Sequence, residues 1–244
     1  MVGVKRDMLK RYCDFDEHYY AYYSDLEMED QEDNYTPIYI GGNMGGKNRS
    51  GKLFVLSGPS GVGKTTLANE LFNRLGKTYN MHRVITYTTK APRKGERNGI
   101  DYHFVTESEF QSKLANGFFI EYSQVYGCYY GSPKSIIREL ANGKSFLLIV
   151  DQAGAYQIKE QYNGAVLVWI TPPSMTELVS RLKNRATDLS ADIEKRLIIA
   201  ASELETEQNR SGFDYIVENN VLELALTSLT EILKAEILSG STNC

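Results

Sequence analysis

The chain has 244 residues, 42% of them hydrophobic, which is enough to bury one substantial core, or one core with inserted lobes. Its net charge of −4 lies entirely in residues 1–50, because residues 51–244 hold 21 Lys/Arg and 21 Asp/Glu, so no charge excess favours nucleic acid or an anionic membrane as a partner. Three scattered cysteines, no apolar run of membrane-spanning length, and an acidic N-terminus unlike a secretory signal or a transit peptide favour the cytoplasm.

Residues 1–50 form an acidic, tyrosine-rich N-terminal extension. They hold six Lys/Arg, ten Asp/Glu and seven of the 17 tyrosines, and residues 41–46 read G-G-N-M-G-G, the composition of a flexible linker. We expect a mostly disordered extension or a misassigned start, and the alternative is a tail that docks a protein partner or carries modified tyrosines. The folded domain is therefore expected over residues 51–240.

The clearest motif follows the apolar run Leu53–Leu56, where residues 58–65 read G-P-S-G-V-G-K-T. Its glycines let the backbone curl and aim successive N–H groups at phosphate oxygens, while Lys64 supplies a point charge and Thr65 a hydroxyl for Mg²⁺. A helix over Thr65–Leu75 would place the phosphates at its N-terminus, which disfavours the alternative of a solvated Gly/Ser turn. The motif predicts a nucleoside triphosphate site made by Ser60, Gly61, Val62, Gly63, Lys64, Thr65 and Thr66.

Strand-like and helix-like segments alternate from residue 52 onward, and this predicts an α/β fold, a P-loop NTPase-type parallel sheet flanked by helices. Strands are expected at residues 53–56, 83–86, 145–150, 165–170 and 215–217, and helices at 65–75, 133–141, 175–183, 191–209 and 222–237.

Residues 102–130 break this alternation, since they are rich in Tyr and Phe and carry only one short helix, around Ser108–Ala115. We interpret this stretch as an inserted lobe of mixed strands, the place where a second substrate would be read. The loop that leads into it is punctuated by Gly and Pro and carries Lys90, Arg93, Lys94 and Arg97. Such a loop suits an anionic ligand, which Arg93 can hold with two parallel hydrogen bonds, but a solvated surface loop has the same composition.

The motifs of this loop and of the segments after it resemble guanylate kinase. The similar segments are Thr86–Tyr102, Phe119-Ile120-Glu121, Tyr129-Tyr130-Gly131-Ser132, Asp151-Gln152-Ala153-Gly154, Thr171–Ser174, Arg181–Arg185, Lys195-Arg196-Leu197 and Asp214–Asn219. The resemblance spans about residues 52–237. It implies phosphoryl transfer from ATP with Mg²⁺ to GMP, and to dGMP, by a domain whose core is residues 51–85 and 133–240, with a GMP-binding lobe at about 86–132 and a helical lid at about 185–195.

The resemblance also implies how GMP is held. Glu121 accepts hydrogen bonds from N1–H and N2–H₂ of guanine, a pairing that adenine cannot make because its N1 is an acceptor. Lys90 stands where the family has Arg, so weaker GMP binding is expected. Read alone, the two tyrosines of this set would be core residues of the lobe and Glu121 a solvent-facing residue. The GMP-binding residues implied are Thr86, Lys90, Arg93, Tyr102, Glu121, Tyr130, Ser132 and Asp151.

Phosphoryl transfer between two polyanions requires neutralisation of charge and alignment more than covalent chemistry. Lys64, Arg181, Arg185 and Arg196 are the catalytic residues implied, with Ser190 as N-cap of the helix that carries Arg196. Lid closure over them would exclude water.

Several assignments leave alternatives open. Arg181 has an alternative partner in Glu177, four residues before it. Asn219 resembles the family residue that meets the adenine of ATP. Ile149 stands where the family often has an acid, which leaves the outer shell of the magnesium ion unassigned. The rival readings of the whole chain are a catalytically silent interaction module of the same fold, disfavoured by the intact phosphate loop, and a related small-molecule kinase.

Overall fold

The computed structural model describes residues 50–125, 127–183, 190–210 and 212–239. The predicted extension therefore lies outside the described residues except for Ser50, and so do Arg185 and the first part of the predicted lid.

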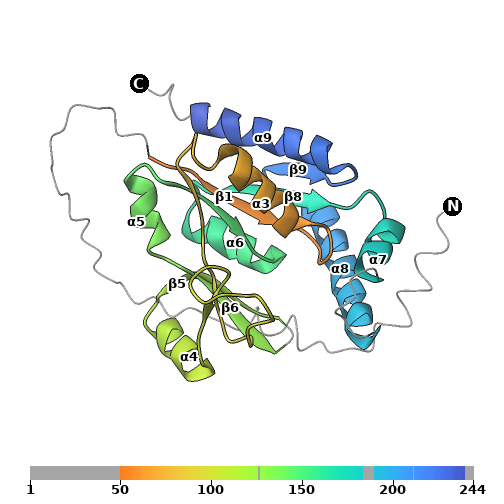
Figure 1. The fold of residues 1–244 in the computed structure, drawn as a ribbon, viewed down its shortest axis with the longest axis horizontal. Coiled ribbons are helices and arrows are strands. Elements are labelled where there is room, and N and C mark those ends of the chain that lie inside the picture. Colours follow the sequence, from red (N-terminus) through yellow and green to blue (C-terminus); the bar gives the residue numbers. More distant parts are fainter. Residues whose placement is uncertain (1–49, 126, 184–189, 211, 240–244) are drawn as a thin grey trace. The chain divides into compact units, whose positions relative to one another are not determined.

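The core is a parallel sheet of five strands in the order β2-β7-β1-β8-β9 (Figure 1). The strands are β1 (Leu53–Ser57), β2 (Met81–Arg83), β7 (Ser145–Ile149), β8 (Val166–Thr171) and β9 (Tyr215–Glu218), and every neighbouring pair is parallel. This confirms the predicted fold class. The central strand β1 has β7 on one side and β8 on the other. From β1 the chain continues to β2 and β7 on one side of the sheet and later to β8 and β9 on the other, so β1 marks the point where the strand order changes direction. In parallel sheets, ligands bind beyond the carboxyl ends of the strands at such a switch point.

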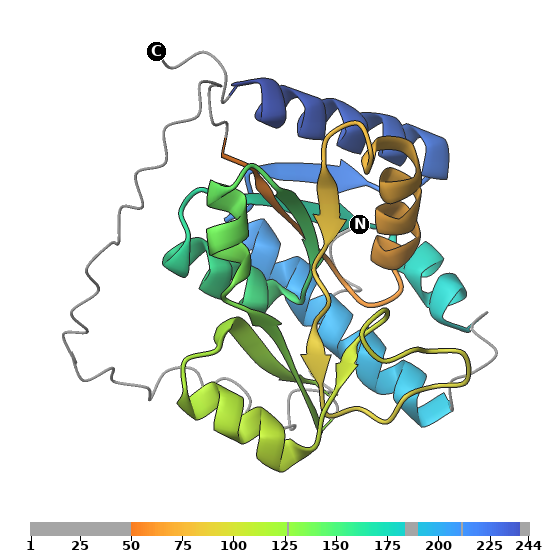
Figure 2. The same ribbon diagram turned by 60° about the vertical axis from the view of Figure 1, so that its left-hand side comes forward.

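Alternate residues of β1 enter two separate hydrophobic cores. Phe54 and Leu56 pack with α3 (Lys64–Leu75), α9 (Leu222–Ser239) and α7 (Met175–Lys183), whereas Leu53 and Val55 pack with α5 (Ile136–Ala141) and α6 (Gln152–Gln161). The two groups of helices cover opposite faces of the sheet, as Figures 1 and 2 show. A strand buried on both faces is apolar along its whole length, and this is why the run Leu53–Leu56 could be recognised as a strand from the sequence. None of the helices in the described ranges is long and apolar enough to cross a membrane.

The inserted lobe is a second sheet of four strands in the order β4-β3-β6-β5. It consists of β3 (Tyr87–Thr88), β4 (His103–Phe104), β5 (Phe119–Val125) and β6 (Cys128–Pro133), with α4 (Glu107–Ala115) packed beside it. The sheet is mixed, because β3 pairs with β4 in parallel but with β6 antiparallel. Aromatic rings hold the lobe together: Phe110 of α4 stacks on Phe119 and Tyr129, with ring centroids 4.6 and 5.3 Å apart.

Two predicted elements were wrong at their boundaries, and one observed helix was not predicted. The strand expected at residues 83–86 ends at Arg83, because the chain then leaves the core sheet and the carbonyl of Thr86 accepts the N–H of His103 in the lobe. The helix expected from Pro133 begins at Ile136, since Pro133 is the last residue of β6. Helix α6 was not predicted. It is capped by Asp151, whose side chain accepts the N–H of Gly154.

Helix α8 (Ser190–Arg210) packs against α7 and reaches α6, where the hydroxyl of Tyr156 donates to Glu207 at 2.7 Å. It matches the helix expected at residues 191–209. The side chain of Ser190, the predicted N-cap, lies outside the described residues.

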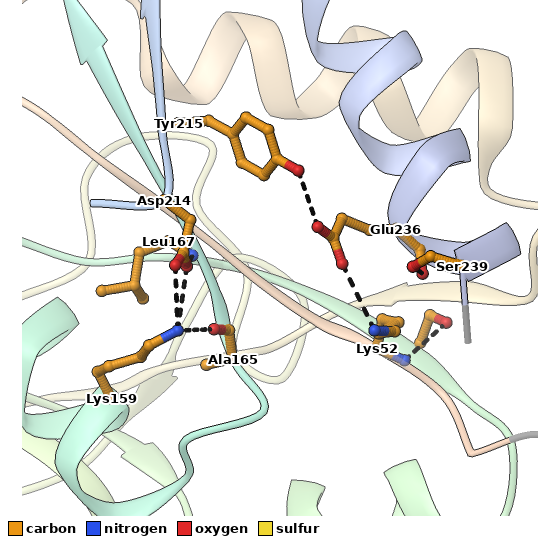
Figure 3. A network of polar contacts seen from close by, with 9 residues as sticks. Lys52, Lys159, Ala165, Leu167, Asp214, Tyr215, Glu236 and Ser239 are labelled. Carbon is orange, nitrogen blue, oxygen red and sulfur yellow. Dashed lines mark hydrogen bonds and ion pairs between the residues drawn. The ribbon is translucent and has the colours of Figure 1, made fainter. Parts of the chain in front are cut away.

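Polar contacts hold the edge strand β9 in place (Figure 3). Asp214, just before the strand, accepts the N–H of Leu167 at 2.8 Å and pairs with Lys159 of α6 at 3.1 Å. The hydroxyl of Tyr215 donates at 2.8 Å to Glu236 of α9, which also pairs with Lys52. These contacts fix the position at which β9 ends, one residue before Asn219.

Candidate active site

The phosphate loop leaves β1 at the carboxyl edge of the core sheet and leads directly into α3. At Gly58 (φ +143°) a Cβ atom would lie 2.2 Å from the carbonyl oxygen of Ile170, so no side chain fits there. Gly63 is the N-cap of α3 with a left-handed backbone (φ 98°, ψ 16°), a conformation that favours glycine. The curled backbone brings Ser60, Gly61 and Val62 into a tight turn before the N-terminus of α3.

Lys64 and the two threonines after it form the first turn of α3. The Lys64 ammonium donates to the carbonyl oxygens of Gly58 at 2.5 Å and Pro59 at 3.1 Å, so its charge lies against the loop itself. Thr65 and Thr66 are exposed beside it. This places a cation and a hydroxyl at the end of the helix that attracts anions.

Asn219 supports the loop from the end of β9. Its buried side-chain amide donates to the carbonyl oxygen of Val62 at 2.8 Å, and its own carbonyl oxygen accepts a hydrogen bond of 2.9 Å from Arg181 of α7. Arg181 also pairs with Glu177 at 3.0 Å, the alternative that the sequence left open. The amide therefore holds the loop, and α7 is tied to the same point.

Glu121 is the most deeply buried carboxyl of the lobe, with 3% of the residue exposed. It lies on β5 directly opposite Ser132 of β6, whose hydroxyl donates to Glu121 Oε1 at 2.5 Å. Burial raises the pKa of Glu121 to about 8, and the nearby charge of Asp151 acts in the same direction. At Gly154 a Cβ atom would lie 2.8 Å from Glu121 Oε2, so the start of α6 approaches this carboxyl closely. Glu121 is thus a core-facing group and not the solvent-facing residue of the alternative interpretation.

A further acid faces the same region from α8. Burial raises the pKa of Glu203, which the Lys64 ammonium opposes and the charge of Asp151 reinforces, so this carboxyl lies near both groups. Arg196 is seven residues earlier on α8 and therefore on the same face of the helix. Glu203 was not predicted from the sequence, because an acid in a charged helix resembles a solvated residue.

In the basic loop, Lys90 forms an ion pair within the loop. Its ammonium lies 2.7 and 2.8 Å from the two carboxylate oxygens of Glu96, and 4.8 Å from the centre of the Tyr102 ring. Glu96 also accepts the N–H of Arg93. Although burial opposes ionisation, these hydrogen bonds and the charges of Lys90 and Arg93 hold the pKa of Glu96 below its usual value. Glu96 was not singled out from the sequence.

The two predicted phosphate-binding tyrosines lie beside each other, with ring centroids 6.2 Å apart. Tyr102 and Tyr130 are both half-buried, and burial is the main cause that raises the pKa of each hydroxyl. The charge of Arg93 opposes both rises, so the exposed Arg93 lies near both hydroxyls. Thr86 lies in the wall of a cavity that also contains Tyr102 and Thr65, which links the lobe to the phosphate loop.

The structure thus brings the predicted acceptor residues into one region beside the phosphate loop, at the carboxyl edge of the core sheet. Arg185 is the predicted site residue that lies outside the described residues. In the described ranges, no group of three or more His, Cys, Asp or Glu side chains is gathered as a metal site.

Comparisons with known proteins identify relatives of this chain. A family model described as "Guanylate kinase" matches residues 50–236. The chain is 42% identical over 187 residues to a guanylate kinase of Myxococcus xanthus, covering 76% of this chain and 87% of the relative. It is 43% identical over 196 residues to one of Protochlamydia amoebophila, covering 79% and 95%. The crystal structure of guanylate kinase from Anaplasma phagocytophilum is similar with a TM-score of 0.63 and 34% identity, covering 78% of this chain and 88% of that one.

Proposed function

The chain belongs to the guanylate kinase family, and on that premise we propose that it transfers the γ-phosphoryl group of ATP to GMP, and to dGMP, giving ADP and the nucleoside diphosphate. Its place would be in purine nucleotide metabolism in the cytoplasm. The observation that carries the proposal is the buried carboxyl of Glu121, paired with Ser132, in a chain that keeps the lysine and threonine of its phosphate loop.

Glu121 and Ser132 would read the base. The ionised carboxylate would accept two hydrogen bonds from the donor edge of guanine, and Asp151 lies beside it. The hydroxyl of Thr86 would donate to O6, as would that of Ser132 once it turns away from Glu121. Adenine would leave the buried carboxylate facing the lone pair of N1, and an unpaired buried polar group is strongly unfavourable. Arg93, Tyr102, Tyr130 and Lys90 would hold the phosphate.

Lys64 and the loop backbone would hold the β- and γ-phosphates of ATP. The Lys64 ammonium, now bonded to two carbonyls of the loop, needs only to turn toward a phosphate oxygen. Asn219 would position the loop beneath the phosphates. No general base is required, because the phosphate oxygen of GMP is already an anionic nucleophile.

The donor set fits Mg²⁺. The exposed hydroxyl of Thr65 lies in the first turn of α3 and in the wall of the cavity with Thr86, so it offers the hard oxygen ligand that Mg²⁺ prefers. The phosphates and water would complete the shell, and the ion would neutralise charge on the transferring group. Arg181 of α7, Arg196 of α8 and Arg185 of the predicted lid would add positive charge.

A coupled assay of ADP release, offering GMP, dGMP, AMP, CMP and UMP in turn, tests the proposal. We expect turnover with GMP and dGMP that is abolished by chelation of Mg²⁺. Absence of any GMP-dependent turnover would leave the silent interaction module, and preference for another acceptor would favour the related small-molecule kinase. Removal of residues 1–50 should leave turnover unchanged if the extension serves only to dock a partner.

A further inference from the structure

Arg83, the last residue of β2, is a cation near the site that belongs neither to the phosphate loop nor to the acceptor segment that begins at Thr86. It lies two residues after the buried Met81 and so on the same side of the strand, toward α3. There it lines a cavity of about 60 Å³ together with Thr65, Thr86, Tyr102 and Ile149. These neighbours come from the first turn of α3, the acceptor lobe and β7, so the cavity lies where donor and acceptor regions meet.

The guanidinium of Arg83 is not paired with any carboxylate of the described residues. Within the described residues its side chain makes no hydrogen bond and no ion pair. Asp101, the acid in the wall of the same cavity, accepts the N–H of Arg97 at 2.8 Å. Lys90, by contrast, is held by both oxygens of Glu96. A half-buried guanidinium with five free donors is a strong site for an anion.

The charge of Arg83 reaches the hydroxyl that is expected to meet phosphate. Burial raises the pKa of Tyr102. Among the charged groups that act on this hydroxyl, Arg83 has the largest effect on the pKa, ahead of Glu96 and Arg93, and it lowers the pKa. Arg83 is also firmly anchored, since β2 pairs with β7 and the next N–H, that of Val84, donates to Leu147 at 3.1 Å. Arg93 sits on an exposed loop instead.

We propose that Arg83 binds the phosphate of the acceptor nucleotide together with Tyr102, an assignment that rests on the proposed function. Its planar fork supplies two parallel N–H donors to two phosphate oxygens, the contact that Lys90 cannot make. At Ile149 the cavity wall is apolar, so no carboxylate at that position competes for the guanidinium. Arg83 thereby substitutes for the forked contact that is missing at position 90.

Calorimetric titration of the full chain with GMP, guanosine and ATP separates this role from a structural one. Arg83→Met keeps the length of the side chain and removes its charge. A bidentate charged contact is worth about 1.5–3 kcal/mol, so we expect the Kd for GMP to rise about 10- to 100-fold. The Kd values for guanosine, which lacks the phosphate, and for ATP should change less than about twofold. Arg138→Met, at an exposed position on α5, is the matched control and should change none of them.

Three results would overturn the assignment: an unchanged Kd for GMP, equal losses for GMP and guanosine, or a loss confined to ATP. Thermal unfolding of each variant shows whether it is folded. If Arg83→Met does not fold, Arg83→Lys carries the same test, with an expected loss of about fivefold for GMP only. A wild-type chain that binds no GMP would overturn the proposed function as well, whereas normal wild-type binding with an unaffected variant would overturn this inference alone.

Discussion

The phosphate loop and the acceptor lobe recognise their ligands by different means. The loop offers backbone N–H groups in a turn that its glycines make possible, and its position is fixed by β1, α3 and a single buried amide from Asn219. The lobe offers side chains, namely a buried carboxyl, two tyrosines and several cations. Glu121 is held by Ser132, Lys90 by Glu96, and the rings of Tyr102 and Tyr130 lie against each other.

This difference determines how each site responds to change. A backbone cradle carries no titrating group of its own, so its geometry depends on local sequence and on the few contacts that hold it. A side-chain site depends on which partners each group has in three dimensions. Glu121 has its pKa raised to about 8 by burial, and Lys90 is paired with Glu96.

Lys64→Ala should have the largest effect, because it removes the one cation that the donor loop contributes. We expect kcat to fall by at least about 10³-fold while the Kd for GMP stays within about twofold. Lys77→Ala, at an exposed position just after α3, is the control for loss of a lysine. Steady-state kinetics and circular dichroism measure both. A loss of less than tenfold in a folded variant would contradict the role given to Lys64.

Glu121→Gln should break recognition in the lobe and leave the loop intact. The amide keeps the shape of the side chain but presents an N–H₂ group toward the donors of guanine, so kcat/KM for GMP should fall about 10²- to 10³-fold. The KM for ATP should not change. Glu107→Gln, exposed on α4 in the same lobe, serves as the control. Retention of the wild-type preference for GMP over AMP would show that the base is read elsewhere.

Asn219→Ala tests whether the backbone cradle depends on one side chain. Loss of its hydrogen bond leaves the carbonyl of Val62 unpaired, at about 1–1.5 kcal/mol, so the KM for ATP should rise about 5- to 10-fold. Binding of GMP should be unaffected, because the hydrogen bond of this amide goes to the phosphate loop and not to the lobe. The adjacent, exposed Asn220→Ala is the control. An equal rise in the KM values for ATP and GMP would contradict the claim that Asn219 supports the ATP site alone.

Lys90→Arg should have the smallest effect. Its fork can keep the contact with Glu96 and still direct an N–H group at the phosphate, so the Kd for GMP should fall about two- to fivefold. Lys94→Arg, an exposed substitution on the same loop, should leave the Kd unchanged. Unchanged or weaker binding of GMP by the Lys90 variant would indicate that position 90 serves only the ion pair.

The same contrast explains what could be predicted from the sequence. The phosphate loop is one continuous motif and β1 is apolar on both faces, so both were predictable. Helix α6 was missed because Gly154 near its start reads as a turn, whereas its cap depends on Asp151. The bond between Asn219 and Val62 joins residues 157 positions apart and leaves no local pattern.

The acceptor lobe itself was predicted from the aromatic residues that break the alternation of strands and helices, but the roles of its side chains were predictable only through the resemblance of its motifs. Nothing in the spacing of residues 86–102 shows that Glu96 pairs with Lys90, although the two are only six positions apart, because loop residues have no fixed period. Arg83 was taken for an ordinary strand residue, since its environment is created by the fold, where α3 and the lobe meet.

The most direct test of this account is the number of protons released when GMP binds. In the free protein at pH 7, burial keeps Glu121 largely protonated, because its pKa is about 8, yet the carboxylate must be ionised to accept both guanine donors. Calorimetric titration at pH 7 in buffers of different ionisation enthalpy should therefore show about one more proton released by the wild-type chain than by Glu121→Gln. Equal proton release by the two proteins would contradict the claim that a buried, ionised Glu121 reads guanine.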